Sequence, residues 1–176
     1  MGYFDTINAI LIVIAPLIAV EIWSAILRFA LDYKTDRMCD KWAVILDGLV
    51  VSLFSTALFA LLGFVIIITV RPQHMWLIYF MGFGVMWQNI MSGIARGLER
   101  NRLYMGAGVA GSVLTLILNF ILLRYFRMGV AGLFLATTIG LFVHCSVIFF
   151  GAQVMKNIRG HRPNRWRINQ MLVFAW

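Results

Sequence analysis

Five long runs of hydrophobic residues, each interrupted by only a few polar side chains, dominate the chain. They lie near residues 6–28, 43–70, 75–95, 103–124 and 130–155. A helix of about 20 residues crosses a bilayer core of about 30 Å, so each run is long enough to span a membrane. The pattern predicts an all-α fold, a polytopic transmembrane bundle of about five spans within residues 1–155.

Composition supports the same class. Of 176 residues, 62% are hydrophobic and 12% are charged, whereas about a quarter of residues are charged in soluble domains. The opening MGYFDTIN has no basic region, and no small-residue cleavage site precedes Glu21. We therefore expect the first run to be retained as a span rather than removed as a signal peptide.

Lysines and arginines fall mainly on one side of the predicted spans. Twelve lie on that side: Arg28, Lys34, Arg37, Lys41, Arg96, Arg100, Arg102, Lys156, Arg159, Arg162, Arg165 and Arg167. The other three are Arg71, Arg124 and Arg127. The positive-inside rule makes the side with twelve cytoplasmic, so the N-terminus is predicted outside and the C-terminal tail inside. Short clusters between spans are typical of such orientation signals, so no nucleic-acid partner is expected. An outside start without a signal sequence would be natural if one span preceded Met1.

Two connections carry most of the remaining charge. Residues 156–169 are basic without acidic residues and are predicted to form a cytoplasmic linker that contacts anionic lipid headgroups. Residues 170–176 are expected to begin a further, truncated span. Between the first two spans, DYKTDRMCDKW alternates in sign up to Lys41, a pattern that favours a solvated loop.

Two ionisable residues stand out in the first run. Glu21 and Arg28 are seven positions apart, which on one helix places them on the same face and about 10 Å apart along the axis. An ionisable group inside a span indicates function by default, so we expect Glu21 to line a water-filled cavity. Arg28 could do the same, or could extend its charge to the cytoplasmic interface from the helix end.

Polar stripes recur in the other spans. They are Asp47, Gly48, Ser52 and Ser55; Asn89, Ser92 and Arg96; Ser112, Thr115 and Asn119; and Thr137 with His144. Asp47, expected one turn into its helix, has the simpler explanation that it favours the N-terminal dipole. His144 could be a hydrogen-bonded histidine or a proton carrier. The repetition predicts helices that surround a wet interior rather than a simple anchor.

Enzyme chemistry is not expected. Cys39 and Cys145 show neither a disulfide pattern nor metal-ligand spacing. The three histidines fall in different parts of the predicted topology, and no HExxH, GxSxG or paired-aspartate motif occurs. The sequence predicts no catalytic residues, no metal and no cofactor.

Most of the chain resembles a known family. The resemblance is carried by MSGIARGLERNRLYMGAGVAGSVLTLILNFILL with RYFRMGVAGLFLAT, by GYFDTINAI with EIWSAILRFALD, and by KNIRGHRPNRWRINQMLVFAW. These segments are similar to the Wzx-type polysaccharide-biosynthesis flippases of the multidrug/oligosaccharidyl-lipid/polysaccharide (MOP) exporter superfamily. That family has fourteen helices in two lobes, and this chain would correspond to spans two to six with the start of span seven. It departs from the family in having no first helix and no second lobe.

The resemblance implies an inner-membrane flippase. It would move an undecaprenyl-diphosphate-linked oligosaccharide across the membrane by alternating access, for polysaccharide, O-antigen or capsule synthesis. It implies Arg28 as first and Arg96 as second phosphate partner, Glu21 as coupling or gating acid, and amides such as Asn89 and Asn119 on sugar hydroxyls. Membrane lipids and other polysaccharide-assembly proteins would be partners. The alternatives are a drug or cation antiporter of the same superfamily, or a small structural membrane subunit.

Overall fold

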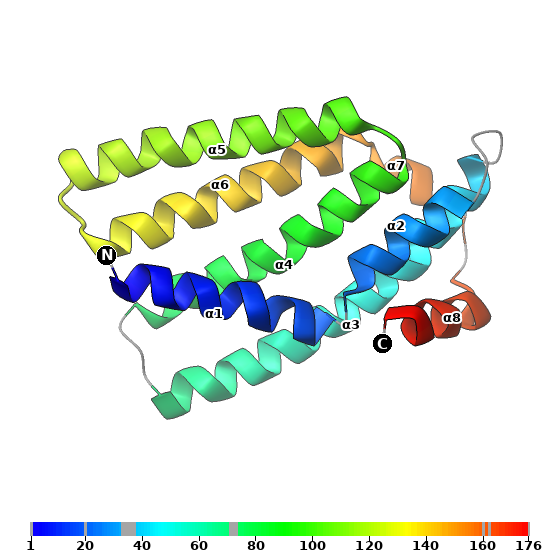
Figure 1. The fold of residues 1–176 in the computed structure, drawn as a ribbon, viewed down its shortest axis with the longest axis horizontal. Coiled ribbons are helices and arrows are strands. Elements are labelled where there is room, and N and C mark those ends of the chain that lie inside the picture. The colour runs from blue at the N-terminus through cyan, green and yellow to red at the C-terminus, as the bar shows by residue number, and fades with distance from the viewer. Residues whose placement is uncertain are drawn as a thin grey trace.

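The computed structural model describes residues 2–19, 21–32, 38–70, 74–159, 161 and 163–175. These ranges contain helices and no strand, in the order α1 (Gly2–Ala19), α2 (Ile22–Asp32), α3 (Met38–Val70), α4 (Met75–Gly97), α5 (Asn101–Arg124), α6 (Val130–Gly151), α7 (Val154–Ile158) and α8 (Arg165–Ala175). The long helices lie along one direction and form an elongated bundle (Figure 1). The predicted all-α bundle is confirmed.

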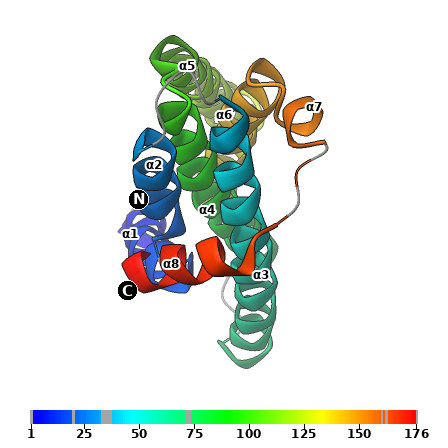
Figure 2. The ribbon, with the colours of Figure 1, turned by 90° about the vertical axis from the view of Figure 1, so that its right-hand side faces the viewer.

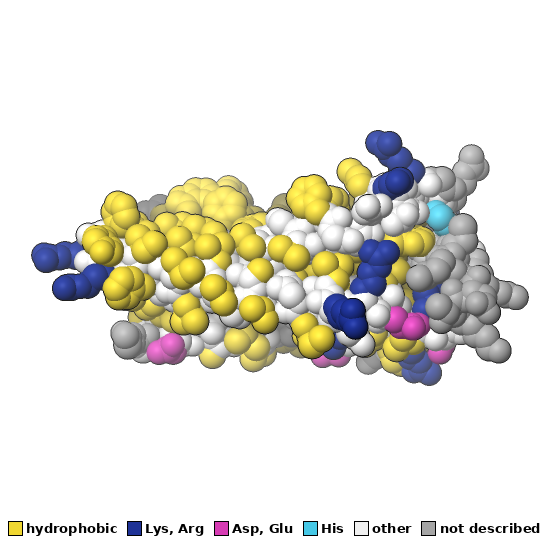
Figure 3. Space-filling model, turned by 90° about the horizontal axis from the view of Figure 1, so that it is seen from above, with side chains coloured by type: hydrophobic (Ala, Val, Ile, Leu, Met, Phe, Trp, Pro, Cys, Tyr) yellow, Lys and Arg dark blue, Asp and Glu magenta, His cyan; other side chains and the backbone are white. Residues whose placement is uncertain are grey.

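Four helices are long and apolar enough to cross a membrane. They cover Lys41–Ile66, Met75–Gly97, Asn101–Arg124 and Val130–Gly151, while the apolar stretch Gly2–Ala15 is shorter. Hydrophobic side chains cover the middle of the face seen in Figure 3, and lysines and arginines gather toward its two ends. A multi-pass membrane protein follows from this architecture, because so much apolar surface is compatible with lipid and not with water.

Small residues let the helices approach closely. α5 packs along α6, and α4 lies against both α6 and α2 (Figure 1). A Cβ atom on Gly93 of α4 would lie 2.9 Å from the backbone oxygen of Trp23 in α2, and one on Gly111 of α5 would lie 2.9 Å from the backbone oxygen of Gly140 in α6. Glycine is therefore needed at both crossings.

The first predicted span is divided, so its expected continuous helix is wrong. α1 ends at Ala19 and α2 begins at Ile22, with Glu21 between them at a φ of 46°. That left-handed conformation is unfavourable for a residue other than glycine and ends helical hydrogen bonding. Glu21 and Arg28 therefore do not share a helix face, because Glu21 precedes the helix that carries Arg28.

The helix that contains the second span begins earlier than predicted, at Met38 rather than residue 43, and its membrane-spanning stretch begins at Lys41. The expected solvated loop is wrong for Lys41, which lies within α3, is 0% exposed and bonds the Glu99 carboxylate at 2.6 Å. Residues 33–37 of that loop lie outside the described residues. The pair ties the start of α3 to the connection between α4 and α5.

The tail also differs from its predicted boundaries. α6 ends at Gly151 rather than 155, and Gln153, at a φ of 52°, separates it from α7. α7 runs from the end of the predicted bundle into the predicted linker. α8 begins within that linker and runs on through most of 170–176. α8 lies across α2 and α3 rather than along the bundle (Figure 2).

The close contact of α5 with α6 predicts a strong effect of one methyl group. We expect Gly140→Ala to destabilise the protein by about 1–3 kcal/mol, because the new Cβ would overlap the Thr115 hydroxyl and lie 2.9 Å from the Gly111 backbone oxygen. Gly106→Ala is the matched control, since nothing lies within 4 Å of its new Cβ. Denaturant unfolding in detergent micelles measures both, and equal stabilities would contradict this packing.

Candidate functional site

A polar cleft of about 250 Å³ lies between α4, α5 and α6. It is lined by Gln88, Gly108, Gly111, Ser112, Thr115, Thr137, Gly140, Leu141 and His144. An amide, three hydroxyls and an imidazole thus face a common space within three helices that are long enough to span the membrane. No aspartate, glutamate, lysine or arginine is among these lining residues.

Local helix chemistry explains the shape of the cleft. Glycines on α5 and α6 lack the side chains that would fill it, and Thr115 turns its hydroxyl to donate to the Gly111 carbonyl at 2.9 Å. Threonine commonly makes this bond inside a helix, and its oxygen can still accept another. No hydrogen bond from the side chains of Gln88, Ser112 or Thr137 is found within the described residues. Water or a ligand is needed to satisfy them, because hydrocarbon cannot.

His144 forms the buried end of the cleft and is held by its neighbours. It is 4% exposed, and its Nε2 lies 3.2 Å from the Ser92 hydroxyl of α4. Its ring meets the edge of Tyr104 on α5, with the ring centres 6.3 Å apart. The structure therefore contains the hydrogen-bonded histidine, one of the two roles that the sequence leaves open.

Arg96 extends this set of contacts toward one end of α4. Its Nε donates to the Ser92 backbone oxygen at 3.3 Å, and its guanidinium carbon lies 5.5 Å from the centre of the Tyr104 ring. The ring face is attractive to a cation at this range. A chain of contacts thus connects the Arg96 guanidinium to His144 in the polar cleft. It passes through Ser92 and Tyr104, each of which contacts both residues.

The two predicted asparagines do not line the cleft. Asn89 is half-buried on α4, and the amide that reaches the cleft belongs to its neighbour Gln88. Sequence reasoning missed Gln88, although its spacing of four residues from Ser92 places both on one helix face. Asn119 is half-buried on α5, and its buried Oδ1 has no hydrogen-bond partner among the described residues.

Arg28 lies in a different part of the protein. It is exposed on α2, and its guanidinium carbon is 4.2 Å from the centre of the Phe174 ring in α8. The Phe29 ring is nearly perpendicular to the same Phe174 ring, and the two ring centres are 6.2 Å apart. Glu21 is exposed at the break between α1 and α2. Of the five predicted site residues, only Arg96 is connected to the cleft by contacts, so the predicted set does not converge in one place.

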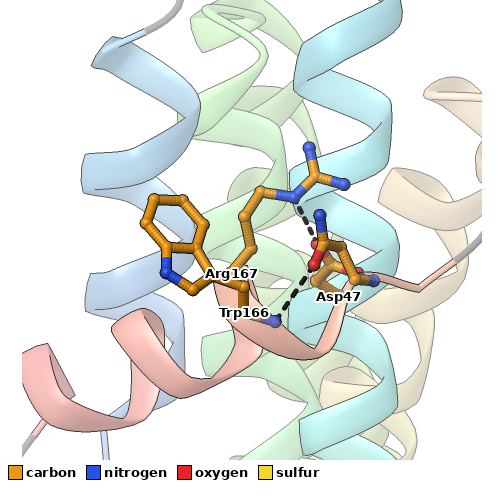
Figure 4. A network of polar contacts seen from close by, with 4 residues as sticks. Asp47, Trp166 and Arg167 are labelled. Atoms are coloured by element: carbon orange, nitrogen blue, oxygen red, sulfur yellow. Dashed lines mark hydrogen bonds and ion pairs between the residues drawn. The ribbon is translucent and has the colours of Figure 1, made fainter.

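Asp47 is a buried acid whose setting differs from the one expected. It lies ten residues into α3, is 0% exposed, and its Oδ2 is 2.8 Å from the Nε of Arg167 in α8 (Figure 4). The explanation by the helix dipole is wrong, because α3 begins at Met38 and the effect decays within the first turn. Sequence spacing could not reveal the pair, since its partners are 120 positions apart.

Two further results bear on what the site can do. The described residues contain no group of three or more His, Cys, Asp and Glu side chains that could hold a metal ion. Comparison with family models, curated proteins and solved structures finds no match to this chain. The chemistry present is hydrogen bonding in the cleft, which suits hydroxyl-rich groups, and arginine, which suits phosphate.

The contact between Ser92 and His144 is expected to contribute measurably to the free energy of unfolding. We expect Ser92→Ala to lower the free energy of unfolding by about 1–3 kcal/mol, because it leaves a buried imidazole without its partner. Ser146→Ala on α6 is the control, because that exposed hydroxyl bonds only back to the Phe142 carbonyl, and we expect its effect to stay within about 0.5 kcal/mol. Denaturant titration compares them; equal losses would show that Ser92 does not support His144.

Proposed function

We propose that this protein is a lobe of a Wzx-type flippase, which moves a lipid-linked oligosaccharide across the cytoplasmic membrane during polysaccharide synthesis. The observation that carries the proposal is the polar cleft between three helices that are each long enough to span a membrane. A bundle that served only as an anchor would have no need of such a cleft, since polar side chains inside a membrane are costly. The sequence resemblance described above supplies the substrate class.

The side-chain chemistry fits that substrate. Sugar hydroxyls both donate and accept hydrogen bonds, as do the Gln88 amide and the hydroxyls of Ser112 and Thr137. A diphosphate carries negative charge that arginine pairs with in a forked geometry. Arg96, next to the cleft, and Arg28, exposed on α2, are the candidate phosphate partners. The hydrocarbon chain of the substrate would remain in the bilayer.

The topology proposed from charge agrees with this role. With the N-terminus outside and the basic tail inside, Arg28 and Arg96 lie toward the cytoplasmic ends of their helices, where a substrate made in the cytoplasm would arrive. A drug or cation antiporter of the same superfamily is less well supported, because a cation site favours carboxylates and none lines the cleft.

Transport should depend on the two arginines. In cells that lack the chromosomal gene, we expect Arg28→Ala and Arg96→Ala copies to export at least about tenfold less polysaccharide than the unmutated copy, the factor expected for one lost charged contact. Lysine at either position should restore part of the export, because it keeps the charge and loses the fork. Lipid-linked oligosaccharide held on the cytoplasmic face is the second readout.

Arg124→Ala is the matched control for charge. This exposed arginine is the last residue of α5, on the side of the membrane opposite to the one proposed for Arg28 and Arg96. It should export normally. If the unmutated gene, expressed together with the part that supplies the second lobe, does not restore export, or if all three alanine variants export normally, the flippase proposal is wrong.

Glu21 provides a separate test of energy coupling. If it is the coupling acid, Glu21→Gln should lower export about tenfold or more and remove its dependence on the proton or sodium gradient. Asp32→Asn, an exposed carboxylate on α2, is the control. Export by Glu21→Gln that stays normal at every pH and ion condition would eliminate the coupling role.

A further inference from the structure

Both oxygens of the Asp47 carboxylate are held from the region of α8. Oδ1 accepts the backbone N–H of Asn164 at 2.8 Å, and Oδ2 lies 2.8 Å from the Nε of Arg167. Figure 4 shows the Arg167 side chain extending from α8 to meet Asp47 on α3. Asn164 also caps α8, because its side-chain oxygen accepts the N–H of Trp166 at 3.0 Å. The same residue, Asn164, therefore both caps the start of α8 and attaches it to α3.

The same face of α8 continues this attachment. Arg167, Met171 and Phe174 lie at i, i+4 and i+7, which places them on one side of the helix. Met171 is 0% exposed and lies against Gly48, next to Asp47 on α3. Phe174 covers one face of the Arg28 guanidinium on α2. The opposite side of α8 is open, with Val173 79% exposed and Trp166 67% exposed.

The attachment of α8 to α3 depends on the charge of the buried Asp47 carboxylate. Asp47 is 0% exposed and lies within the stretch of α3 that is apolar enough to span the membrane. Within the described residues, Arg167 is the cation that pairs with it. If α8 moved away with Asp47 still ionised, the carboxylate would lose its paired cation within a stretch of α3 that is apolar enough to span the membrane, which is strongly unfavourable. The charge on Asp47 and the position of α8 must therefore influence each other equally in both directions.

We propose that α8 is a latch, held across α2 and α3 by the charge of Asp47, and that neutralising this carboxylate releases α8 and removes the Phe174 ring from the exposed Arg28 guanidinium. The role of Arg28 rests on the proposed function, whereas the latch itself rests only on the contacts of Asp47, Arg167 and Met171. In the closed state the Phe174 ring lies over the Arg28 guanidinium, with the guanidinium carbon 4.2 Å from the ring centre. In the open state Arg28 is free to turn toward a phosphate group.

Cysteine labelling measures the latch without any transport assay. In a background with Cys39 and Cys145 replaced by serine, the chain in phospholipid nanodiscs receives one cysteine at a time and is treated with a water-soluble maleimide. Met171→Cys reports the covered face of α8, and Val173→Cys reports its open face. Ala107→Cys, 0% exposed on α5, reports unfolding elsewhere.

Asp47→Asn is the test variant, because it removes the charge and keeps an oxygen for the Asn164 N–H. We expect it to raise the labelling rate at position 171 by at least about tenfold, which corresponds to about 1.4 kcal/mol of lost ion-pair energy. Positions 173 and 107 should stay within about twofold. Arg167→Gln should raise the labelling rate at position 171 as much as Asp47→Asn does, and Arg167→Lys should raise it less. The double variant Asp47→Asn/Arg167→Gln should label no faster than Asp47→Asn alone.

The outcomes separate the two proposals. Unchanged labelling at position 171 in Asp47→Asn, or a rise there matched by position 107, would overturn the latch whatever transport shows. A selective rise at position 171 establishes it. With the latch established, polysaccharide export that Asp47→Asn leaves unchanged would show that release of α8 is not part of transport, and failure of the unmutated gene, expressed together with the second lobe, to restore export would reject the flippase alone.

Discussion

Inside a bilayer, every polar side chain must find its partner within the protein or in trapped water, because hydrocarbon offers none. This constraint accounts for three long-range polar contacts among the described residues. Lys41 is paired with Glu99, Asp47 with Arg167, and Ser92 with His144. Each pair joins residues more than fifty positions apart, so the contacts that satisfy buried polar groups also hold together segments that are distant in the sequence.

The polar cleft is the exception to this pattern. There the side chains of Gln88, Ser112 and Thr137 converge without hydrogen-bonding one another. An apolar cleft of that size could stay empty, whereas a polar one has to hold water or a ligand. The neighbouring Arg96 adds a positive charge that is already oriented by Tyr104. A cleft that is polar but uncharged, beside one cation, matches a molecule that joins a neutral sugar to an anionic phosphate.

Sequence patterns predicted the long helices well because hydrophobic runs determine them. The hydrophobic runs predict α4 at 75–95, where it occupies Met75–Gly97, and α5 at 103–124, where it occupies Asn101–Arg124. The division at Glu21 was missed, since a left-handed backbone at a glutamate has no signature in hydropathy. The setting of Asp47 and the burial of Lys41 were missed because both depend on partners distant in the sequence. Gln88 was within reach, since its spacing from Ser92 was visible.

α3 is longer than a single crossing requires. Its 33 residues extend for about 50 Å at 1.5 Å each, against a hydrocarbon thickness of about 30 Å. Its buried Lys41 fixes one end to the other helices, while large apolar side chains such as Phe64 and Ile68 remain exposed toward the other end. The excess length is taken up by tilting, by local thickening of the lipid, or by extension of the helix ends beyond the stretch Lys41–Ile66 into the interface. The protein should therefore distinguish membranes by thickness, and its distribution between thin and thick bilayers would follow from the length of this one helix.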